Sequence, residues 1–305
     1  MQIIKYFVGV LFVIVIFFAL MPKISGSLKD VEFYCSLDST KVIPVSACIS
    51  KSEDGDSLVI RDNANNIGKV ANISEELLGK QMIYHLRYSH TTKNFIIDKY
   101  ESQILFLTFP FIPGLEDRSR IILFHVPVAW VSVLGFLVSM FYAIRYLWNN
   151  KIEYDYKSAN AASLGFLFCI LATVTGSIWA KFSWGSFWNW DPRETSIFML
   201  LLIYMSYFSL RSAVDVIEKR AKLSSVYSII AFVTVPFFIF ILPRITAGLH
   251  PSSADDANKT VIKSGMSGEM KIVFYLSLLA FTLLFFWIFE LKNRITKLEF
   301  IKKNN

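Results

Sequence analysis

Residues 176–211, GSIWAKFSWGSFWNWDPRETSIFMLLLIYMSYFSLR, form the stretch around which the chain is organised. Twelve consecutive positions of it hold four of the seven tryptophans, Trp179, Trp184, Trp188 and Trp190. Asp191 is predicted to cap the following helix, because Pro192 suits the first helical position and Glu194 stands three residues after the cap. The stretch therefore predicts an apolar helix that begins sharply after an aromatic segment.

The four tryptophans have two interpretations. Indole rings gather where a membrane meets water, so an aromatic belt explains them by composition alone. The spacing W-G-x-x-W-x-W-D favours a second interpretation. Gly185 is expected to allow a close approach between large rings, and Trp188 and Trp190 share one side of the segment if it is extended. These residues then predict a flat apolar shelf that suits a planar aromatic ligand.

The segment WGSFWNWDPRET, residues 184–195, resembles the tryptophan-rich WWD signature of the haem-handling proteins of cytochrome c maturation. The flanking sequences are most similar to the CcmC branch. Residues 191–195, DPRET, combine a CcmC-like arginine and Thr-Ser pair with the D-P-x-E-T form of the CcsA relatives, so the branch stays open. The resemblance covers residues 112–291.

The composition is that of a polytopic membrane protein. The chain has 305 residues, 54% of them hydrophobic, with 28 phenylalanines and a net charge of +7. Several apolar runs approach the ~20 residues that cross a bilayer. The basic residues stand beside these runs, so membrane topology and lipid contact explain the charge better than nucleic acid does. The sequence has no GxxxxGK[ST] phosphate loop and no CxxC pair, which argues against an ATPase or a thiol oxidoreductase.

Six apolar segments predict an all-α polytopic membrane protein with six transmembrane helices: about 6–21, 121–147, 160–180, 195–211, 225–243 and 272–290. The first is expected to be an uncleaved span, since the residues after it make a poor cleavage site. Placing the lysine- and arginine-rich loops inside puts both termini in the cytoplasm and the tryptophan segment on the outer face. The resemblance implies a bacterial cytoplasmic (inner) membrane.

The segment after the first span has a different character. Residues 23–103 are polar, with short β-type runs between turn-forming stretches, and predict a small β-rich extracytoplasmic domain. Its Cys35 and Cys48 are either bridged or free thiols. Residues 104–115 are apolar but broken by prolines, and we expect them to lie at the membrane interface. The expected domains are thus 1–22 (first helix), 23–103 (β-rich), 104–291 (membrane domain) and 292–305 (cytoplasmic tail).

The predicted topology brings two histidines to the outer face beside the tryptophans. His125 opens the second span and His250 follows the fifth, and two imidazoles beside an aromatic surface suit a haem iron with two axial ligands. Either histidine alone is better explained by a bond to neighbouring backbone or a neighbouring helix than by ligation. Residues 125–130, HVPVAW, also resemble the first-histidine motif of the CcmC family. The resemblance implies haem b, with a wider set of site residues: Trp130, Trp179, Trp184, Gly185, Trp188, Trp190, Asp191 and Arg193.

The resemblance implies a role in haem delivery. A CcmC-type protein presents haem to a membrane-anchored chaperone of the CcmE type, beside a CcmA/CcmB ABC transporter and a small CcmD-type subunit. Whether the chain itself is a haem-lyase-like enzyme stays open. One alternative is a CcsA-type synthase subunit, which joins haem directly to an apocytochrome. Another is a membrane-anchored sensor that acts through residues 23–103, for which the tryptophans would be replaceable.

Overall fold

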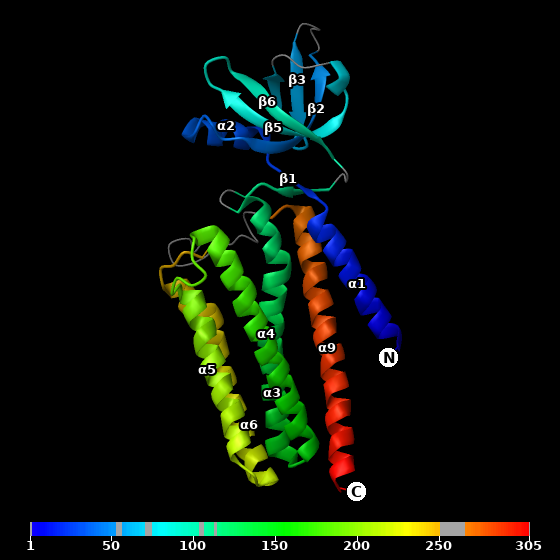
Figure 1. The fold of residues 1–305 in the computed structure, drawn as a ribbon, viewed down its shortest axis with the longest axis vertical. Coiled ribbons are helices and arrows are strands. Elements are labelled where there is room, and N and C mark those ends of the chain that lie inside the picture. Colours follow the sequence, from blue (N-terminus) through cyan, green and yellow to red (C-terminus); the bar gives the residue numbers. More distant parts are fainter. Residues whose placement is uncertain are drawn as a thin grey trace. The chain divides into compact units, whose positions relative to one another are not determined.

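The computed structural model describes residues 2–52, 57–70, 75–103, 107–112, 115–250 and 266–304. It divides into two compact units. The helical unit contains Met1–Ile16, Arg120–Ser264 and Val273–Asn305, and the β-rich unit contains Phe17–Ser119 and Gly265–Ile272. Figure 1 shows the helices of the first unit and the strands of the second.

Five helices in the described ranges are long and apolar enough to cross a membrane. They contain, in chain order, α3 (Ile122–Asn149), α4 (Ile152–Trp184), α5 (Pro192–Ala213), α6 (Ile217–Pro236) and α9 (Gly268–Asn304), and the fourth span continues past α6 to Ile245. The apolar part of α1 (Gln2–Leu20) is shorter, at Lys5–Leu20. The prediction of a multi-pass helical membrane protein is thus confirmed for the five long helices, while α1 as a sixth span stays a prediction.

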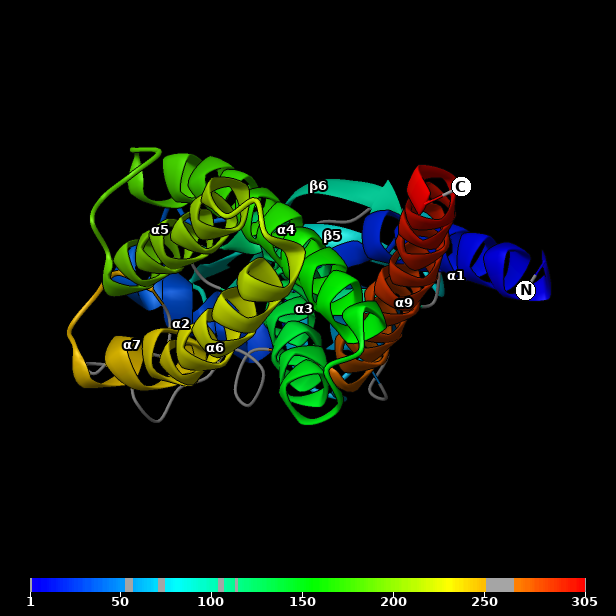
Figure 2. The same cartoon turned by 90° about the horizontal axis from the view of Figure 1, so that it is seen from below.

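Helices α3 and α4 pack closely because two glycines meet between them. A Cβ atom on Gly135 would lie 2.6 Å from the Cα of Gly165. Small residues of this kind let membrane helices approach one another. Nearby, the ring of Phe136 stacks on Tyr204 of α5 with centroids 3.5 Å apart. In Figure 2, α3 and α4 lie between the α5–α6 pair on one side and α9 on the other.

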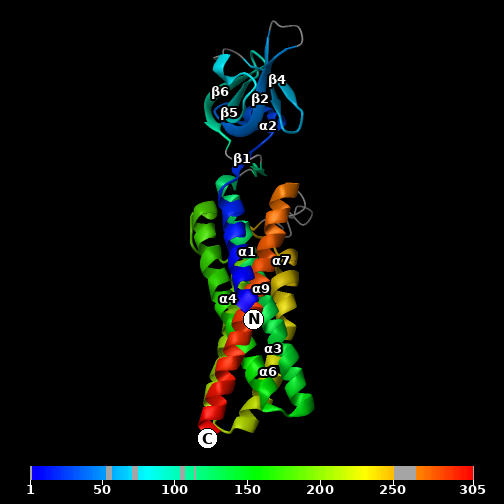
Figure 3. The same ribbon diagram turned by 90° about the vertical axis from the view of Figure 1, so that its right-hand side faces the viewer.

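Two further features of the helical unit are the packing of α1 on α9 and the continuation of the chain beyond α6. Leu11 and Val15 of α1 pack on Ala280 of α9, and these two helices lie together in Figure 3 as well. After α6 the chain continues as a π-helical turn, η3 (Phe237–Ile241), and a short helix, α7 (Leu242–Ile245). This path leads directly to residues 246–250, which carry part of the site described below.

The β-rich unit is a closed five-stranded barrel in the order β2-β3-β4-β6-β5. Its strands are β2 (Ile43–Lys51), β3 (Leu58–Asp62), β4 (Ile67–Val70), β5 (Gln81–Ser89) and β6 (Asn94–Ser102). All pairs are antiparallel except β4 with β6, where Val70 lies opposite Phe95. This closed Greek-key order is that of an OB-type barrel. The prediction of a β-rich domain is confirmed.

Three shorter helical elements and one further strand pair accompany the barrel. Helix α2 (Leu28–Leu37) begins at a Ser27–Asp30 capping box and contributes Leu28, Val31 and Cys35 to the barrel core. The 3₁₀ turns are η1 (Glu75–Leu77) and η2 (Glu116–Ile121). Strand β1 (Lys23–Ser25) pairs in parallel with β7 (Thr108–Pro110). Residues 108–110 of the segment expected at 104–115 thus form a strand, and its position at the membrane interface stays a prediction. Residues 104–106 and 113–114 of that segment lie outside the described residues.

The two cysteines of this unit are free thiols. Cys35 belongs to the barrel core together with Val45, Ala47 and Ile49 of β2. Cys48 lies between Ala47 and Ile49 on the same strand, so its side chain points to the opposite face. Cys35, on α2, packs against the core-facing side of β2, whereas Cys48 points from the other side. The two thiols therefore do not meet, and of the bridged and free states that the sequence left open the structure has the free one.

Candidate functional site

The first two tryptophans of the signature pack with His250. Trp179 and Trp184 lie in the last two turns of α4, with ring centroids 4.7 Å apart in an edge-to-face arrangement. The imidazole of His250 lies 5.6 Å from the Trp179 ring and 6.1 Å from the Trp184 ring, measured between centroids. We refer to Trp179, Trp184 and His250 as the tryptophan–histidine cluster. It joins the end of α4 to a residue 66 positions beyond Trp184.

The other two tryptophans form a separate group. Trp188 and Trp190 lie edge to face, with centroids 5.8 Å apart and an interplanar angle of 90°. Both rings pack on Phe198 of α5, with centroid-to-centroid distances of 6.3 Å for Trp188 and 6.4 Å for Trp190. The flat shelf expected from these two residues is therefore wrong. Trp190 adopts φ +57°, and this left-handed residue breaks the alternation that an extended segment would have imposed.

Gly185 has a different role from the one expected. It ends α4 in the left-handed conformation, with φ +83°, and its N–H donates to the carbonyl oxygen of Lys181. Apart from its two chain neighbours, no described residue lies within 4 Å of a Cβ built on it, so no aromatic ring approaches it closely. Glycine is needed here because other residues are strained in this backbone conformation. The Lys181 ammonium also donates to the Gly185 carbonyl oxygen, which completes the helix end.

Asp191 joins the signature to the segment that carries His250. Its Oδ1 atom accepts from the N–H of Arg193 at 2.9 Å, and Glu194 completes the predicted capping box. Its Oδ2 atom accepts from the backbone N–H groups of Leu249 and His250, at 2.8 and 3.3 Å. Asp191 as a whole residue is only 4% exposed. Asp191 is thus both the cap of α5 and the anchor of residues 249 and 250.

Gly248 makes this anchoring possible. A Cβ atom at this position would lie 2.6 Å from Oδ2 of Asp191 and 2.9 Å from Cδ of Pro192. Real Cβ contacts are not that short, so a side chain here would push the backbone away from the start of α5. No role for Gly248 is predictable from the sequence, because the residues that it approaches are almost sixty positions earlier.

His125 of α3 lies against the same end of α4, at Gly176, which is about one helical turn before Trp179. A Cβ atom on Gly176 would lie 3.0 Å from Cε1 of its ring. The Nδ1 atom of His125 is 2.9 Å from Oγ1 of Thr175. Thr175 donates its single hydroxyl proton to the carbonyl oxygen of Leu171, at 2.8 Å. The carbonyl oxygen of Ala172 lies 3.2 Å from the same hydroxyl. With its proton directed to these helix carbonyls, Thr175 accepts from Nδ1–H of His125 and the lone pair lies on Nε2; the opposite tautomer would require Thr175 to donate to His125.

The two remaining candidates differ in their relation to this group. Arg193 lies within electrostatic range of His125 and of Arg244. Trp130 lies five residues after His125 on α3, about 140° around the helix, and its Nε1–H donates to Oγ1 of Thr282 in α9. The structure therefore brings Arg193 near His125 but places Trp130 on another face of α3.

Sequence reasoning missed two polar or small positions that shape the site, Thr175 and Gly248. Thr175 directly precedes the small residue Gly176 within an apolar helix, and a small pair at such a position is a signal of close packing. That signal does not identify His125 as the partner. The partner is fixed only by the crossing of α3 over α4.

Comparisons with known proteins identify one family profile and relatives of two names, heme exporter protein C (CcmC) and CcsA. The family profile described as "Heme exporter protein C" (CcmC) matches residues 108–304. A cytochrome c biosynthesis ccmC-like mitochondrial protein of Marchantia polymorpha is 30% identical over 190 residues, which is 62% of this chain and 78% of that protein. Heme exporter protein C of Bradyrhizobium diazoefficiens is 31% identical over 170 residues, 54% of this chain and 62% of the relative. The cytochrome c biogenesis protein CcsA of Cuscuta reflexa is 31% identical over 113 residues, covering 37% of this chain and 36% of the relative.

Proposed function

The chain belongs to the heme exporter protein C (CcmC) family, and from this premise we propose that it binds haem through His125 and His250 during cytochrome c maturation. Membership of the family, together with relatives named for cytochrome c biogenesis, supports haem handling in a multi-pass membrane protein. Beyond haem handling, we propose the individual ligands, haem b as the haem type and the receiving partner.

The observation that carries the proposal is the placement of both imidazoles at one end of α4. His125 packs on Gly176 and His250 packs on Trp179, and the rise between those two positions is about 4.5 Å. The chemistry of the donors fits iron. Nδ1 of His125 is occupied by Thr175, so Nε2 presents its lone pair, the arrangement that metal-ligating histidines adopt.

The surrounding residues have separable tasks in this proposal. Trp179 and Trp184 supply an apolar wall beside His250, and Asp191 holds the backbone that carries this histidine. Arg193 supplies positive charge for propionate groups. Haem, when bound, supplies the iron for ligation and a vinyl edge for later attachment. Trp188 and Trp190 form a second aromatic surface next to the site, to which we assign contact with the haem edge or with the receiving protein.

We propose the membrane orientation and the partners from the family resemblance and the distribution of basic residues. We place the tryptophan segment outside the cytoplasm and both termini inside, because the basic residues gather at the opposite ends of the helices. In this arrangement the receiving partner is a CcmE-type chaperone, and a CcmA/CcmB-type transporter with a CcmD-type subunit assembles with the chain. The sequence supplies no phosphate loop, so energy from ATP has to come from such a partner.

A CcsA-type synthase role is the second candidate. Relatives named CcsA match the chain over a shorter part than those named heme exporter protein C. The two roles differ in the acceptor. A synthase subunit would transfer haem to apocytochrome thiols in the absence of a haem chaperone, whereas the first role requires the chaperone.

The test is the visible absorption spectrum of the protein purified in mild detergent. The wild type is expected to show six-coordinate haem, and His125→Ala and His250→Ala are each expected to lose or shift that spectrum. His90→Ala, in the β-rich unit, is the matched control and should leave the spectrum unchanged. A wild type that stays colourless after haem is added would overturn the proposal, as would a spectrum indifferent to both substitutions.

A further inference from the structure

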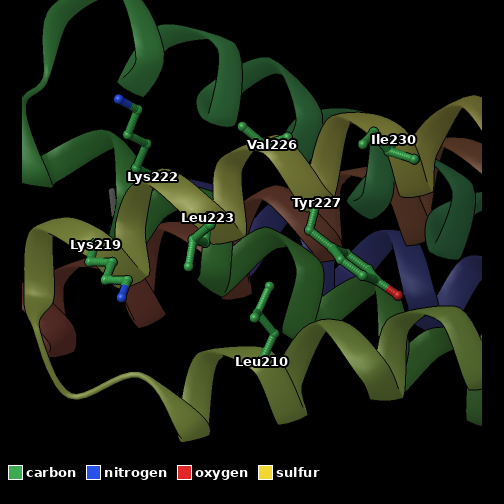
Figure 4. Close-up of a pocket in the computed structure, with 7 residues that line it drawn as sticks. All are labelled: Leu210, Lys219, Lys222, Leu223, Val226, Tyr227 and Ile230. Carbon is green, nitrogen blue, oxygen red and sulfur yellow. The ribbon is translucent and has the colours of Figure 1, made fainter.

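An apolar groove lies at the far end of the α5–α6 hairpin from the haem site. Its volume is about 370 Å³, and Figure 4 shows its lining residues: Leu210, Lys219, Lys222, Leu223, Val226, Tyr227 and Ile230. Leu210 lies 18 residues after Pro192 on α5, about 27 Å along the helix. The groove is therefore separate from the residues that surround His125 and His250.

The groove is polar at one end only. Lys219 and Lys222 lie in the first two turns of α6, and the lining beyond them is aliphatic or aromatic, as Figure 4 shows. From Lys219 to Ile230 the helix rises by about 16 Å. That length is close to half of the ~30 Å hydrocarbon thickness of a bilayer. The groove thus matches one leaflet, with cations at the headgroup level and apolar side chains down to the midplane.

The two lysines have their charge available. Neither makes an ion pair or a side-chain hydrogen bond with any of the described residues. Glu218 lies in the same turn but does not line the groove. The first turn of α6 also has no side-chain cap, so its backbone N–H groups add positive potential at this end. An anion placed here meets both sources of positive charge.

We propose that this groove binds one anionic phospholipid, with its phosphate at Lys219 and Lys222 and an acyl chain along Leu223, Val226 and Ile230. Basic pockets between membrane helices bind anionic headgroups in this way. A partner helix suits the groove less well, because membrane helix interfaces are built on small residues, and the lining contains none. The Leu223, Val226 and Ile230 side chains are 40%, 43% and 63% exposed, so an acyl chain can reach all three.

The test is native mass spectrometry of the whole protein with dioleoyl phosphatidylglycerol and with dioleoyl phosphatidylcholine. The wild type is expected to retain the anionic lipid in preference to the zwitterionic one. Each lysine near a headgroup contributes about fivefold, so Lys219→Gln/Lys222→Gln should lower the phosphatidylglycerol affinity about 30-fold. The matched control is Lys297→Gln/Lys302→Gln, which removes the same charge from exposed positions of α9 outside the groove and should change the affinity less than threefold.

A second variant tests the apolar part. Ile230→Trp fills the deep end of the groove and should weaken retention of both lipids while leaving the ratio between them unchanged. Three results would each overturn the proposal: equal retention of the two lipids by the wild type, equal losses in the groove and control variants, or unchanged retention in Ile230→Trp. Haem displaced from the wild type by phosphatidylglycerol, and no longer bound by the groove variant, would assign the groove to haem instead.

Discussion

Asp191→Asn tests whether the signature aspartate acts through His250. The carboxylate uses Oδ1 to cap α5 and Oδ2 to hold the N–H groups of Leu249 and His250. An asparagine has the same shape but only one acceptor oxygen, so it can serve one side and must turn an NH₂ donor toward the other. We expect it to keep the cap, because Glu194 still supports that side, and to release residues 249 and 250.

The magnitude follows from the bonds that are lost. A hydrogen bond to a charged acceptor contributes about 1.5–3 kcal/mol, and the longer contact to His250, at 3.3 Å, counts for less than the one to Leu249. The loss is therefore about 2–3 kcal/mol. If His250 ligates haem only in its anchored position, haem affinity falls roughly 30- to 150-fold, at 1.4 kcal/mol for each factor of ten.

The assay is a haem titration followed by visible absorption, with thermal unfolding measured on the same samples. Asp215→Asn, at an exposed position between α5 and α6, is the matched control and should titrate as the wild type does. Haem affinity within threefold of the wild type would refute the anchoring role. A general loss of the fold, seen as early unfolding of the haem-free variant, would show that the aspartate acts through stability and not through His250.

Three further predictions concern other parts of the molecule. Thr175→Val removes the acceptor for Nδ1–H of His125, so the His125-dependent haem spectrum should shift and haem affinity should fall about tenfold. Thr173→Val, on the same helix, is the control, and an unchanged spectrum in Thr175→Val would contradict the assigned tautomer. Gly135→Leu should separate α3 from α4 and lower the free energy of unfolding, measured by denaturant titration, by about 2–4 kcal/mol. The reason is that a side chain inserted into a close helix crossing destabilises at least as much as overpacking elsewhere in a core. Unchanged stability would refute the close approach of the two helices. Hydrogen bonds from Lys23 and Lys99 lower the pKa of Glu101 to about 2 from an ordinary 4.5, so the contribution of Glu101 to folding stability is present above pH 4.5 and is lost as the pH falls toward 2. Glu101→Gln should therefore reduce the fall in melting temperature between pH 4.5 and 2. An unaltered pH profile would contradict this prediction.

The spans and the capping box were predictable because both depend on neighbours in sequence. An apolar run of about 20 residues has to be buried in lipid, whichever helices surround it. The cap at Asp191 and Glu194 forms within a single turn, so residue types at fixed offsets were enough to identify it. The β-type runs of residues 23–103 predicted strands for the same local reason, but neither their order nor the closing of the barrel.

The predicted shelf shows where local rules stop. Alternation places Trp188 and Trp190 on one side only if every residue between and beside them is extended. The left-handed backbone of Trp190 cancels that condition, and both rings turn to Phe198 instead. Gly185 is a second example: its position between tryptophans predicted ring contact, whereas its left-handed conformation ends α4.

The sequence by itself determined that this is a helical membrane protein with a β-rich insertion, and that its signature begins a capped helix. Tertiary structure alone decided two pairings across long separations, Thr175 with His125 and Asp191 with residues 249 and 250. It also decided that Cys35 and Cys48 stay apart. The physical reason is the range of the forces involved. Hydrophobic burial and helix capping act on segments in their own sequence order, whereas a hydrogen bond between two helices forms only where their crossing brings donor and acceptor within about 3 Å.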